Sequence, residues 1–525
     1  MRRDSEDYAA AESNTNAAHS AALGHKGERK RNFSPLAMLG LAFAILNTWT
    51  SLAASLSLAL TFGGPASVLW GLITAGFCNL CLAVSLAELL SAYPTAGGQY
   101  HWVAVISWKS WVPLLSWITG WINVSGWLAL ICSGGLCCSQ LITGAISLMH
   151  PNFVASRWHQ FLIYIGYNLV ALLVNAFMTG ALPNISKAAL VWSIAGFVVI
   201  TITVLACASP HYTSAEYVFT EFINETGWPA CIAWLLGLLQ GGLGLIGFDA
   251  VAHMVEEIPN PAVEGPKIMI VCVGIGILTG FILLMALLFV AGRIDGPDGI
   301  IISRAGPLLQ IFYNATGNKA ASIPIVCYLL GTISVMTTSS RVTYAFARDG
   351  GLPFSRFFAE VIQYFVRSSM LQADIQSAFN ALISVSVVAL GVSYGIPVSI
   401  NCLRGRRMLP ESRPFKLSPA VGWTANLIGI AYVILTTVLF LFPPKLPVTG
   451  SNTNYCVVVF VIIVVISMVQ WFVDGRKNFT GPRIDLDFLQ NGDVGRTDPG
   501  FEQGSDAQEA KTPRARVLDI DNSRL

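Results

Sequence analysis

The sequence predicts an all-α integral membrane protein. Of its 525 residues, 54% are hydrophobic and only 11% are charged, whereas a soluble domain carries about 25% charged residues. Its apolar stretches are long enough to cross a bilayer, because a hydrocarbon layer about 30 Å thick requires roughly 20 apolar residues in a helix. Most side chains must therefore face lipid or other apolar helices.

Polar segments at both ends delimit the membrane domain. Residues 1–32 contain the basic cluster Lys26 to Arg31 and no apolar run long enough for a signal peptide. Residues 474–525 are rich in charged residues, Gly and Pro, a composition typical of disorder. We therefore expect a disordered cytoplasmic tail over residues 1–32, a transmembrane domain over residues 33–473 and a second disordered tail over residues 474–525.

Eleven apolar segments qualify as membrane spans. They cover residues 36–62, 66–91, 112–147, 158–180, 187–208, 229–256, 267–291, 320–345, 377–401, 422–443 and 454–473. Basic residues in short loops remain in the cytoplasm, so the basic cluster before the first span places the N-terminus inside. The loop at 209–227 contains three Glu and no Lys or Arg, as an outside loop should.

The charges around the segment at 377–401 contradict this alternating topology. Arg348 follows the preceding span and Arg404 follows this one, so both ends of a single helix carry charge typical of the cytoplasmic side. The stretch before Arg367 has only about ten mostly apolar residues, too few to span a bilayer. Either the charge rule has an exception here, with an interfacial helix at 357–366, or one helix is missing through deletion or a wrongly joined gene model. We favour the missing helix.

Two spans contain residues that weaken a helix. The first has Thr and Ser residues around Trp49, and these are poorer helix formers than Leu or Ala. The sixth has five glycines from Gly237 to Gly247. Gly237 and Gly241 also match the spacing of close helix packing, whereas Gly244 and Gly247 lie beside an acid and favour a break.

Asp249 is the acid that lies deepest within any span. Intramembrane acids are costly and usually face a cavity or a partner, so we expect Asp249 to attract a cation or take part in proton coupling. An acid just after a break also suits an N-cap that satisfies the dipole of the next half-helix, and both roles stay open. His253, one turn further on, titrates near neutral pH in its unperturbed state, but a structural histidine is the commoner case at a helix end.

Four segments in order resemble the amino acid–polyamine–organocation (APC) superfamily of permeases, in its fungal amino-acid, GABA and choline branch. They are "NTWTSLAASLSLALTFGGP" at 47–65, "ELLSAYPTAGGQYHW" at 88–102, "GFDAVAHMVEEIPNPAVEGPK" at 247–267 and "SRVTYAFARDGGLPFSRFF" at 340–358. The resemblance implies an inverted-repeat fold of five plus five spans with broken helices in spans one and six. It also implies twelve spans, of which this chain lacks the ninth.

The resemblance further implies a substrate site between the two breaks. A substrate carboxylate would bind backbone N–H groups near the first break, since a helix N-terminus attracts anions, and its amine would bind carbonyls freed at the second. The expected substrate-binding residues are Trp49, Thr50, Ser51, Leu52, Leu243, Gly244, Leu245, Ile246, Gly247 and Asp249. Relatives often have an aromatic gate at 243–246, which this sequence replaces with Leu, Gly, Leu and Ile.

Charged residues near the cytoplasmic ends of several spans suggest an inner gate. We take Glu88, His253, Glu256, Arg341 and Asp349 as gate or coupling candidates, although a solvated charged loop would show the same pattern. The matching depth of span five lacks the Lys that some relatives use for coupling. Proton coupling is typical of the fungal branch and is expected by resemblance alone.

The resemblance implies a secondary transporter for a small amino acid or amine, such as GABA or choline, working by alternating access in the plasma membrane or the vacuolar membrane. The alternatives are a nutrient sensor built on a transporter fold and an inactive product that lacks one helix. We expect no enzyme, because the short loops show no phosphate loop, metal-ligand cluster or nucleophile paired with a base. We likewise expect no metal, no cofactor apart from a coupling proton and, given a net charge of +2, no nucleic-acid partner. The oligomeric state is left open.

Overall fold

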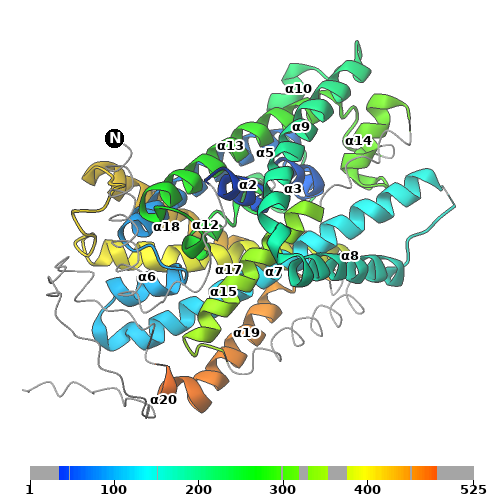
Figure 1. Ribbon diagram of the computed structural model, residues 1–525. Helices are drawn as coiled ribbons and strands as arrows, with labels where there is room; N and C mark the ends of the chain where they lie inside the picture. Colours follow the sequence, from blue (N-terminus) through cyan, green and yellow to red (C-terminus); the bar gives the residue numbers. More distant parts are fainter. Residues whose placement is uncertain are drawn as a thin grey trace, which may run out of the picture.

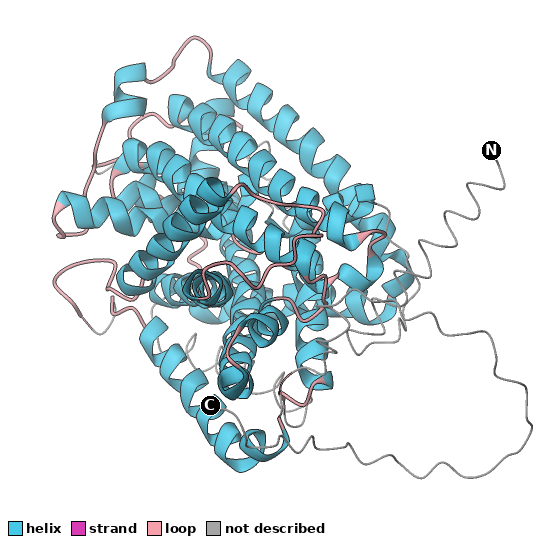
Figure 2. Cartoon of the chain, turned by 90° about the vertical axis from the view of Figure 1, so that its left-hand side faces the viewer, coloured by secondary structure: helices cyan, strands magenta, loops and turns pink. Residues whose placement is uncertain are grey.

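The computed structural model describes residues 35–46, 48–150, 152–296, 299–318, 329–352, 375–449, 452–479 and 481. In these residues the regular secondary structure is helical, and the only β-type pairing is an isolated bridge between Phe62 and Asn224 (Figure 2). The predicted all-α fold is therefore confirmed. The N-terminal tail predicted over residues 1–32 and the segment 357–366 lie outside the described residues.

Long helices run through the molecule and short ones connect them (Figure 1). The long helices and the segments of the two interrupted spans are α2 (Pro35–Leu46), α3 (Thr48–Ala54), α4 (Leu56–Thr61), α5 (Gly64–Ala92), α7 (Val112–Met149), α8 (Arg157–Phe177), α9 (Leu182–Ala208), α11 (Ala230–Leu245), α12 (Ala250–His253), η3 (Val255–Glu257), α13 (Pro261–Val290), α15 (Leu329–Arg348), α17 (Ile375–Leu403), α18 (Pro419–Leu439) and α19 (Cys456–Gln470). The short connecting helices are α6 (Gln99–Ile106), η1 (Lys109–Trp111), η2 (Thr179–Ala181), α10 (Ala215–Thr220), η4 (Ile300–Ile302), α14 (Pro307–Thr316), η7 (Trp471–Gly475) and α20 (Arg476–Asn478).

The predicted spans correspond to these helices. Among the described residues, 10 helices are long and apolar enough to cross a membrane, and they match ten of the eleven predicted segments. The remaining segment, 320–345, begins outside the described residues and continues as α15. The chain is therefore a multi-pass membrane protein.

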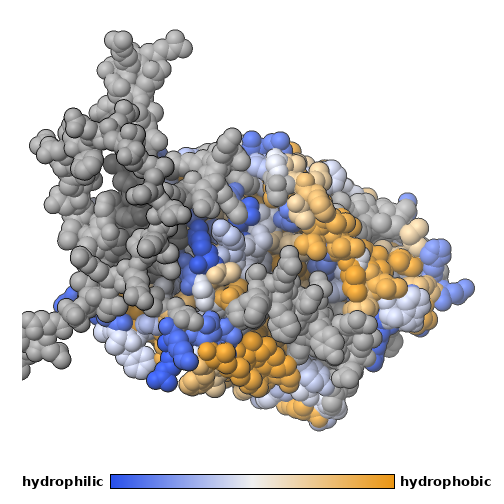
Figure 3. Space-filling view, turned by 60° about the horizontal axis from the view of Figure 1, so that its bottom comes forward, coloured by the Kyte–Doolittle hydropathy of each residue, from blue (hydrophilic) through white to orange (hydrophobic). Residues whose placement is uncertain are grey.

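Helices at the centre and at the rim of the bundle differ in burial. Within its most apolar window α17 is 83% buried, whereas α19 is 6% and α9 is 11% buried. The sequence explains the contrast, because α19 is a run of Val, Ile and Phe without a polar face, as expected of a helix surrounded by lipid. Figure 3 shows such apolar side chains gathered in broad patches on the outer surface.

Three helices end at the same end of the bundle. Tyr93, just after α5, donates its hydroxyl hydrogen to the Met408 carbonyl after α17, and Asp349, just after α15, binds Tyr100 in α6. Helices α15 and α17 therefore run in the same direction, and Arg348 at the end of α15 and Arg404 after α17 lie at one end of the bundle. The chain between them, residues 353–374, lies outside the described residues, so the missing span stays a prediction.

The sixth span is broken where the glycines predicted it. Helix α11 ends at Leu245, Ile246 is extended, and Gly247 has φ +96°, a left-handed conformation that side chains with a Cβ rarely adopt. Gly244, however, is inside α11, where a Cβ would lie 2.7 Å from the Leu52 side chain. Its expected part in the break is wrong, since its missing side chain serves packing against α3.

Gly237 and Gly241 are packing residues in α11. A Cβ on Gly237 would lie 2.2 Å from the Ser67 hydroxyl, and a Cβ on Gly241 would lie 2.8 Å from the Ala75 Cβ. Both neighbours belong to α5, which packs along α11. Of the two interpretations left open for these glycines, close packing is the one that the structure supports.

The first span is segmented differently from the prediction. Thr48, Trp49, Thr50 and Ser51 are helical, in α3, although their propensities favoured a break. The helix is interrupted instead at Ser55, between α3 and α4. The Ser55 hydroxyl donates to the Ser51 carbonyl at 2.6 Å, and such side-chain bonds to the backbone compete with the regular hydrogen bonds of a helix. Asn47, between α2 and α3, lies outside the described residues.

The last span continues beyond the boundary predicted at residue 473. Helical turns extend through η7 and α20 to Asn478. Trp117 of α7 explains the extension, since its ring packs edge-on against Trp471 and Phe479 at centroid distances of 5.3 and 5.2 Å. The rest of the predicted C-terminal tail from residue 482 lies outside the described residues.

Candidate functional site

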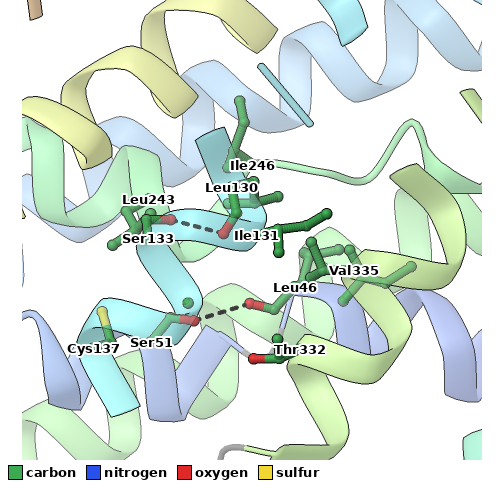
Figure 4. Close-up of a pocket in the computed structure, with 12 residues that line it drawn as sticks. Leu46, Ser51, Leu130, Ile131, Ser133, Cys137, Leu243, Ile246, Thr332 and Val335 are labelled. Atoms are coloured by element: carbon green, nitrogen blue, oxygen red, sulfur yellow. Dashed lines mark hydrogen bonds between the residues drawn. The ribbon is translucent and has the colours of Figure 1, made fainter. Parts of the chain in front are cut away.

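A small cavity lies beside the break of the sixth span (Figure 4). Its volume is about 30 Å³, room for roughly two water molecules. Helices α2, α3, α7, α11 and α15 contribute side chains to it. The lining residues are Ile45, Leu46, Ser51, Leu130, Ile131, Ser133, Gly134, Cys137, Leu243, Ile246, Thr332 and Val335.

The cavity wall is mainly aliphatic, with a few hydroxyl groups. Ser133 donates to the Leu130 carbonyl at 2.9 Å and Ser51 to the Leu46 carbonyl at 3.3 Å (Figure 4). The Thr332 hydroxyl is 2.9 Å from that of Tyr167. Among the lining residues that the structure describes, none is Asp, Glu, Lys or Arg, and none is aromatic. The wall therefore offers hydroxyl and backbone groups to a polar ligand.

Three of the expected substrate-binding residues line the cavity, namely Ser51, Leu243 and Ile246. Trp49 instead points to α9, where its indole N–H donates to the Ser193 hydroxyl at 2.8 Å. Its indole ring lies beside Gly196, where a Cβ would be in ordinary contact at 3.6 Å. The other expected residues are buried around the cavity without lining it. They are Thr50, Leu52, Gly244, Leu245, Gly247 and Asp249.

Asp249 lies next to the break and is completely buried. Its Oδ2 accepts hydrogen bonds from the Gln99 amide at 2.7 Å and the Trp127 indole at 3.3 Å. Its Oδ1 accepts from the Tyr394 hydroxyl at 2.6 Å. These donors come from α6, α7 and α17, so one carboxylate joins three helices that each lie more than 100 residues from it in the sequence.

His253 completes the network around Asp249. Its Nε2 is 3.1 Å from Oδ2 of Asp249, and its Nδ1 is 3.0 Å from the Ala96 carbonyl oxygen. Asp249 stands at the N-cap of α12, yet its side chain makes no capping hydrogen bond. The capping role considered for Asp249 is therefore wrong, because the carboxylate is occupied by partners from other helices.

Sequence reasoning missed three of these partners. Gln99 lies within a motif already singled out, but its amide gave no indication of a partner about 150 residues away. Tyr394 places a phenolic hydroxyl inside a mainly apolar span, where a polar group must find its hydrogen-bond partner within the protein. That rule could have marked Tyr394 as buried against a polar group, though not against which one. Trp127 carried no distinguishing signal.

Ion pairs cluster at the end of the bundle where α5, α15 and α17 finish. Glu257 binds Arg341 at 3.0 Å and Glu256 lies 3.5 Å from Arg348. Asp349 accepts from Tyr100 at 2.9 Å and lies 2.8 Å from His101 Nε2. The structure thus joins Arg341 to the end of the sixth span and ties Asp349 to the start of α6; the gating role of these residues stays a prediction.

Glu88, near the end of α5, forms ion pairs that are separate from those of α15. Its carboxylate pairs with Arg406 at 2.5 Å and Arg413 at 2.7 Å, and it also accepts the backbone N–H of Leu417 at 3.2 Å. The Glu88 side chain is 1% exposed and the two Arg side chains are 8% and 7% exposed. This contact fixes the end of α5 to the segment between α17 and α18.

A bundle of membrane helices around a small cavity, with a helix interrupted beside that cavity, is an architecture typical of membrane transporters. The sequence model of the amino acid permease family matches residues 36–465. The chain therefore belongs to the amino acid permease family of the APC superfamily and is a transporter rather than an enzyme.

Relatives cover most of the chain. A protein of Macrophomina phaseolina provisionally named an amino acid/polyamine transporter is 35% identical over 80% of this chain and 96% of its own length. The choline transporter of Saccharomyces cerevisiae is 32% identical over 86% of this chain and 82% of its own. The amino-acid permease BAT1 of Arabidopsis thaliana is 29% identical over 88% and 95%. These similarities connect the chain to carriers of amino acids and amines.

Proposed function

We propose that this protein imports a small amino acid or amine across the plasma membrane by alternating access, coupled to protons. The vacuolar membrane is the second candidate location. The proposal is carried by one observation, the cavity beside the break at Ile246 and Gly247, because backbone groups released at a break bind polar ends of a substrate. The cavity of about 30 Å³ would have to widen to admit a substrate, as alternating access requires.

The lining favours an amino acid such as GABA over choline. Quaternary ammonium groups are bound by aromatic rings through cation–π contacts, and the described lining has no aromatic residue. An amino acid carries both a carboxylate and an amine, which backbone N–H and carbonyl groups near a break can satisfy without a charged side chain. The aliphatic wall of Leu130, Leu243 and Val335 would then contact the hydrocarbon part of the substrate.

Uptake of labelled GABA, choline and a set of amino acids by cells that produce the full chain tests this proposal. We expect saturable uptake of one or more amino acids, with weaker uptake of choline. Choline uptake alone would overturn the preference for amino acids. Absence of uptake of every compound, with the protein present in the membrane, would favour the inactive product or the nutrient sensor.

A further inference from the structure

We propose that Asp249 and His253 together form the proton-binding site of this transporter, holding one proton as an imidazolium–carboxylate pair. The inference rests on the proposed transport function and names the group that carries the coupling proton. Both side chains are 0% exposed, and they lie one helical turn apart at the broken sixth span. The hydrogen-bond pattern around them determines how many protons they hold.

The Ala96 carbonyl fixes the hydrogen on one ring nitrogen. A carbonyl oxygen only accepts hydrogen bonds, so Nδ1 of His253, 3.0 Å away, must carry a hydrogen. A neutral ring with that hydrogen would point the lone pair of Nε2 at Oδ2 of Asp249, 3.1 Å away. Two buried acceptors at this distance repel each other, so the contact requires a second hydrogen between Nε2 and Oδ2.

The remaining donors place that hydrogen on the ring. Oδ2 already accepts from Gln99 and Trp127, and Oδ1 accepts from Tyr394. Hydrogen bonds donated to a carboxyl group stabilise its ionised form. Asp249 is therefore the carboxylate, and His253 carries hydrogens on both nitrogens.

Loss of the proton from Nε2 would change the contacts between helices. The carboxylate would remain buried with no positive charge beside it, a state far less stable than the pair. Asp249 binds α6, α7 and α17 at once, and the Tyr394 hydroxyl also accepts the Gly247 backbone N–H at 3.2 Å. Proton release is therefore linked to movement of α12 and the break relative to these helices, and the proton stabilises the closed arrangement.

The loop before α6 is shaped for contact with the His253 ring. Gly98 has φ +57°, and a Cβ at this position would lie 2.9 Å from Cε1 of His253. The glycine thus lets the backbone approach the ring closely and brings the Ala96 carbonyl within hydrogen-bond distance. A side chain here would push the loop away.

Other ionisable groups on the neighbouring elements have partners of their own. α12 packs against α2, α13, α15 and η3, and the described part of α2 contains no ionisable residue. On α17 the group facing the pair is Tyr394, described above. The remaining groups pair as Glu257 with Arg341, Glu256 with Arg348, Asp349 with Tyr100 and His101, and Glu264 with Lys267.

The pH dependence of transport tests the proposal. Initial uptake is measured in proteoliposomes across the range in which histidine titrates, roughly pH 5 to 8. We expect wild-type uptake to rise toward acidic pH. In His253→Gln the ratio of the rates at the two ends should fall to about one, since glutamine does not titrate in this range. His211→Gln, at an exposed histidine in the loop between α9 and α10, serves as the matched control and should keep the wild-type ratio.

A measurement without substrate separates this proposal from the transport function. Histidine ¹⁵N chemical shifts of the purified full chain report whether each ring nitrogen carries a hydrogen. The His253 signals are assigned by loss in His253→Gln or in His253→Asn, whichever accumulates. Two protonated nitrogens at neutral pH would support the pair even if no transported compound were found. An unprotonated Nε2, or unchanged pH dependence of uptake in His253→Gln, would overturn it.

Discussion

Asp249 illustrates how a buried carboxylate is stabilised by residues from distant parts of the chain. An isolated ionised carboxylate in an apolar interior is very unfavourable, and here four groups on α6, α7, α12 and α17 donate to its two oxygens or lie within hydrogen-bond distance. Its depth and isolation were evident from the sequence. Its partners were not, because they depend on how α6, α7 and α17 meet in space.

Replacing Asp249 with Asn removes the charge and places an amide hydrogen donor among groups that already donate. We expect Asp249→Asn to lower uptake by at least about tenfold, the equivalent of 1.4 kcal/mol, while the protein still reaches the membrane. Uptake in cells, normalised to the amount of protein in isolated membranes, measures the effect. Normal kinetic constants in this variant would show that the carboxylate is replaceable.

Ser133 offers a direct test of the cavity. Its side chain lines the small space (Figure 4), and the larger Ser133→Leu side chain would fill most of it. We expect a higher KM or complete loss of uptake. The free energy of unfolding should fall by no more than about 3 kcal/mol, the usual upper range for overpacking. An unchanged KM would place substrate binding elsewhere.

At the scale of single elements, the broken sixth span was predictable and the first was less so. Gly247 and the adjacent acid gave a local signal for a break, and the chain does turn there with φ +96°. The polar residues of α3 gave the same kind of signal, yet they are helical. Tertiary contacts override helix propensity, and the Trp49 contact with Ser193 on α9 is one that no local pattern reveals.

Gly247→Ala tests the break. The alanine would have to adopt a left-handed conformation, which costs roughly 1–2 kcal/mol, and its Cβ would lie 3.2 Å from the Ile45 side chain. We expect a lower unfolding temperature in detergent and reduced uptake. Gly274→Ala is the matched control, because a Cβ there meets nothing within 4 Å and the residue is helical; it should be neutral or slightly stabilising. Equal stability of the two variants would contradict our account of the break.

At the scale of the whole molecule, the end of the bundle where α5, α15 and α17 finish is held by ion pairs whose residues the sequence revealed only as charges near the span ends. The pattern predicted which side they occupy, and the structure shows α15 and α17 finishing at that same end. Which acid meets which base followed from the three-dimensional arrangement alone. Glu88 pairs with Arg406 and Arg413, which lie more than 300 residues later in the sequence, and not with Arg341 or Arg348 of α15, which pair with Glu257 and Glu256.

Glu88→Gln would leave two buried guanidinium groups without their carboxylate. Breaking a buried ion pair costs about 3–5 kcal/mol, so we expect a marked drop in the unfolding temperature of the purified protein. Glu264→Gln is the control, since Glu264 pairs with Lys267, whose side chain is 61% exposed, and exposed pairs contribute little. Similar losses in both variants would show that the Glu88 contact has no special role in stability.

The most direct test of the transport account is accumulation of a labelled amino acid by proteoliposomes that contain the purified full chain and have an acidic exterior. We predict accumulation above the external concentration that collapses when a protonophore removes the pH gradient, and much weaker accumulation in Ser133→Leu. Uptake that is equal with and without the gradient, or equal in empty liposomes, would contradict proton-coupled transport through this cavity.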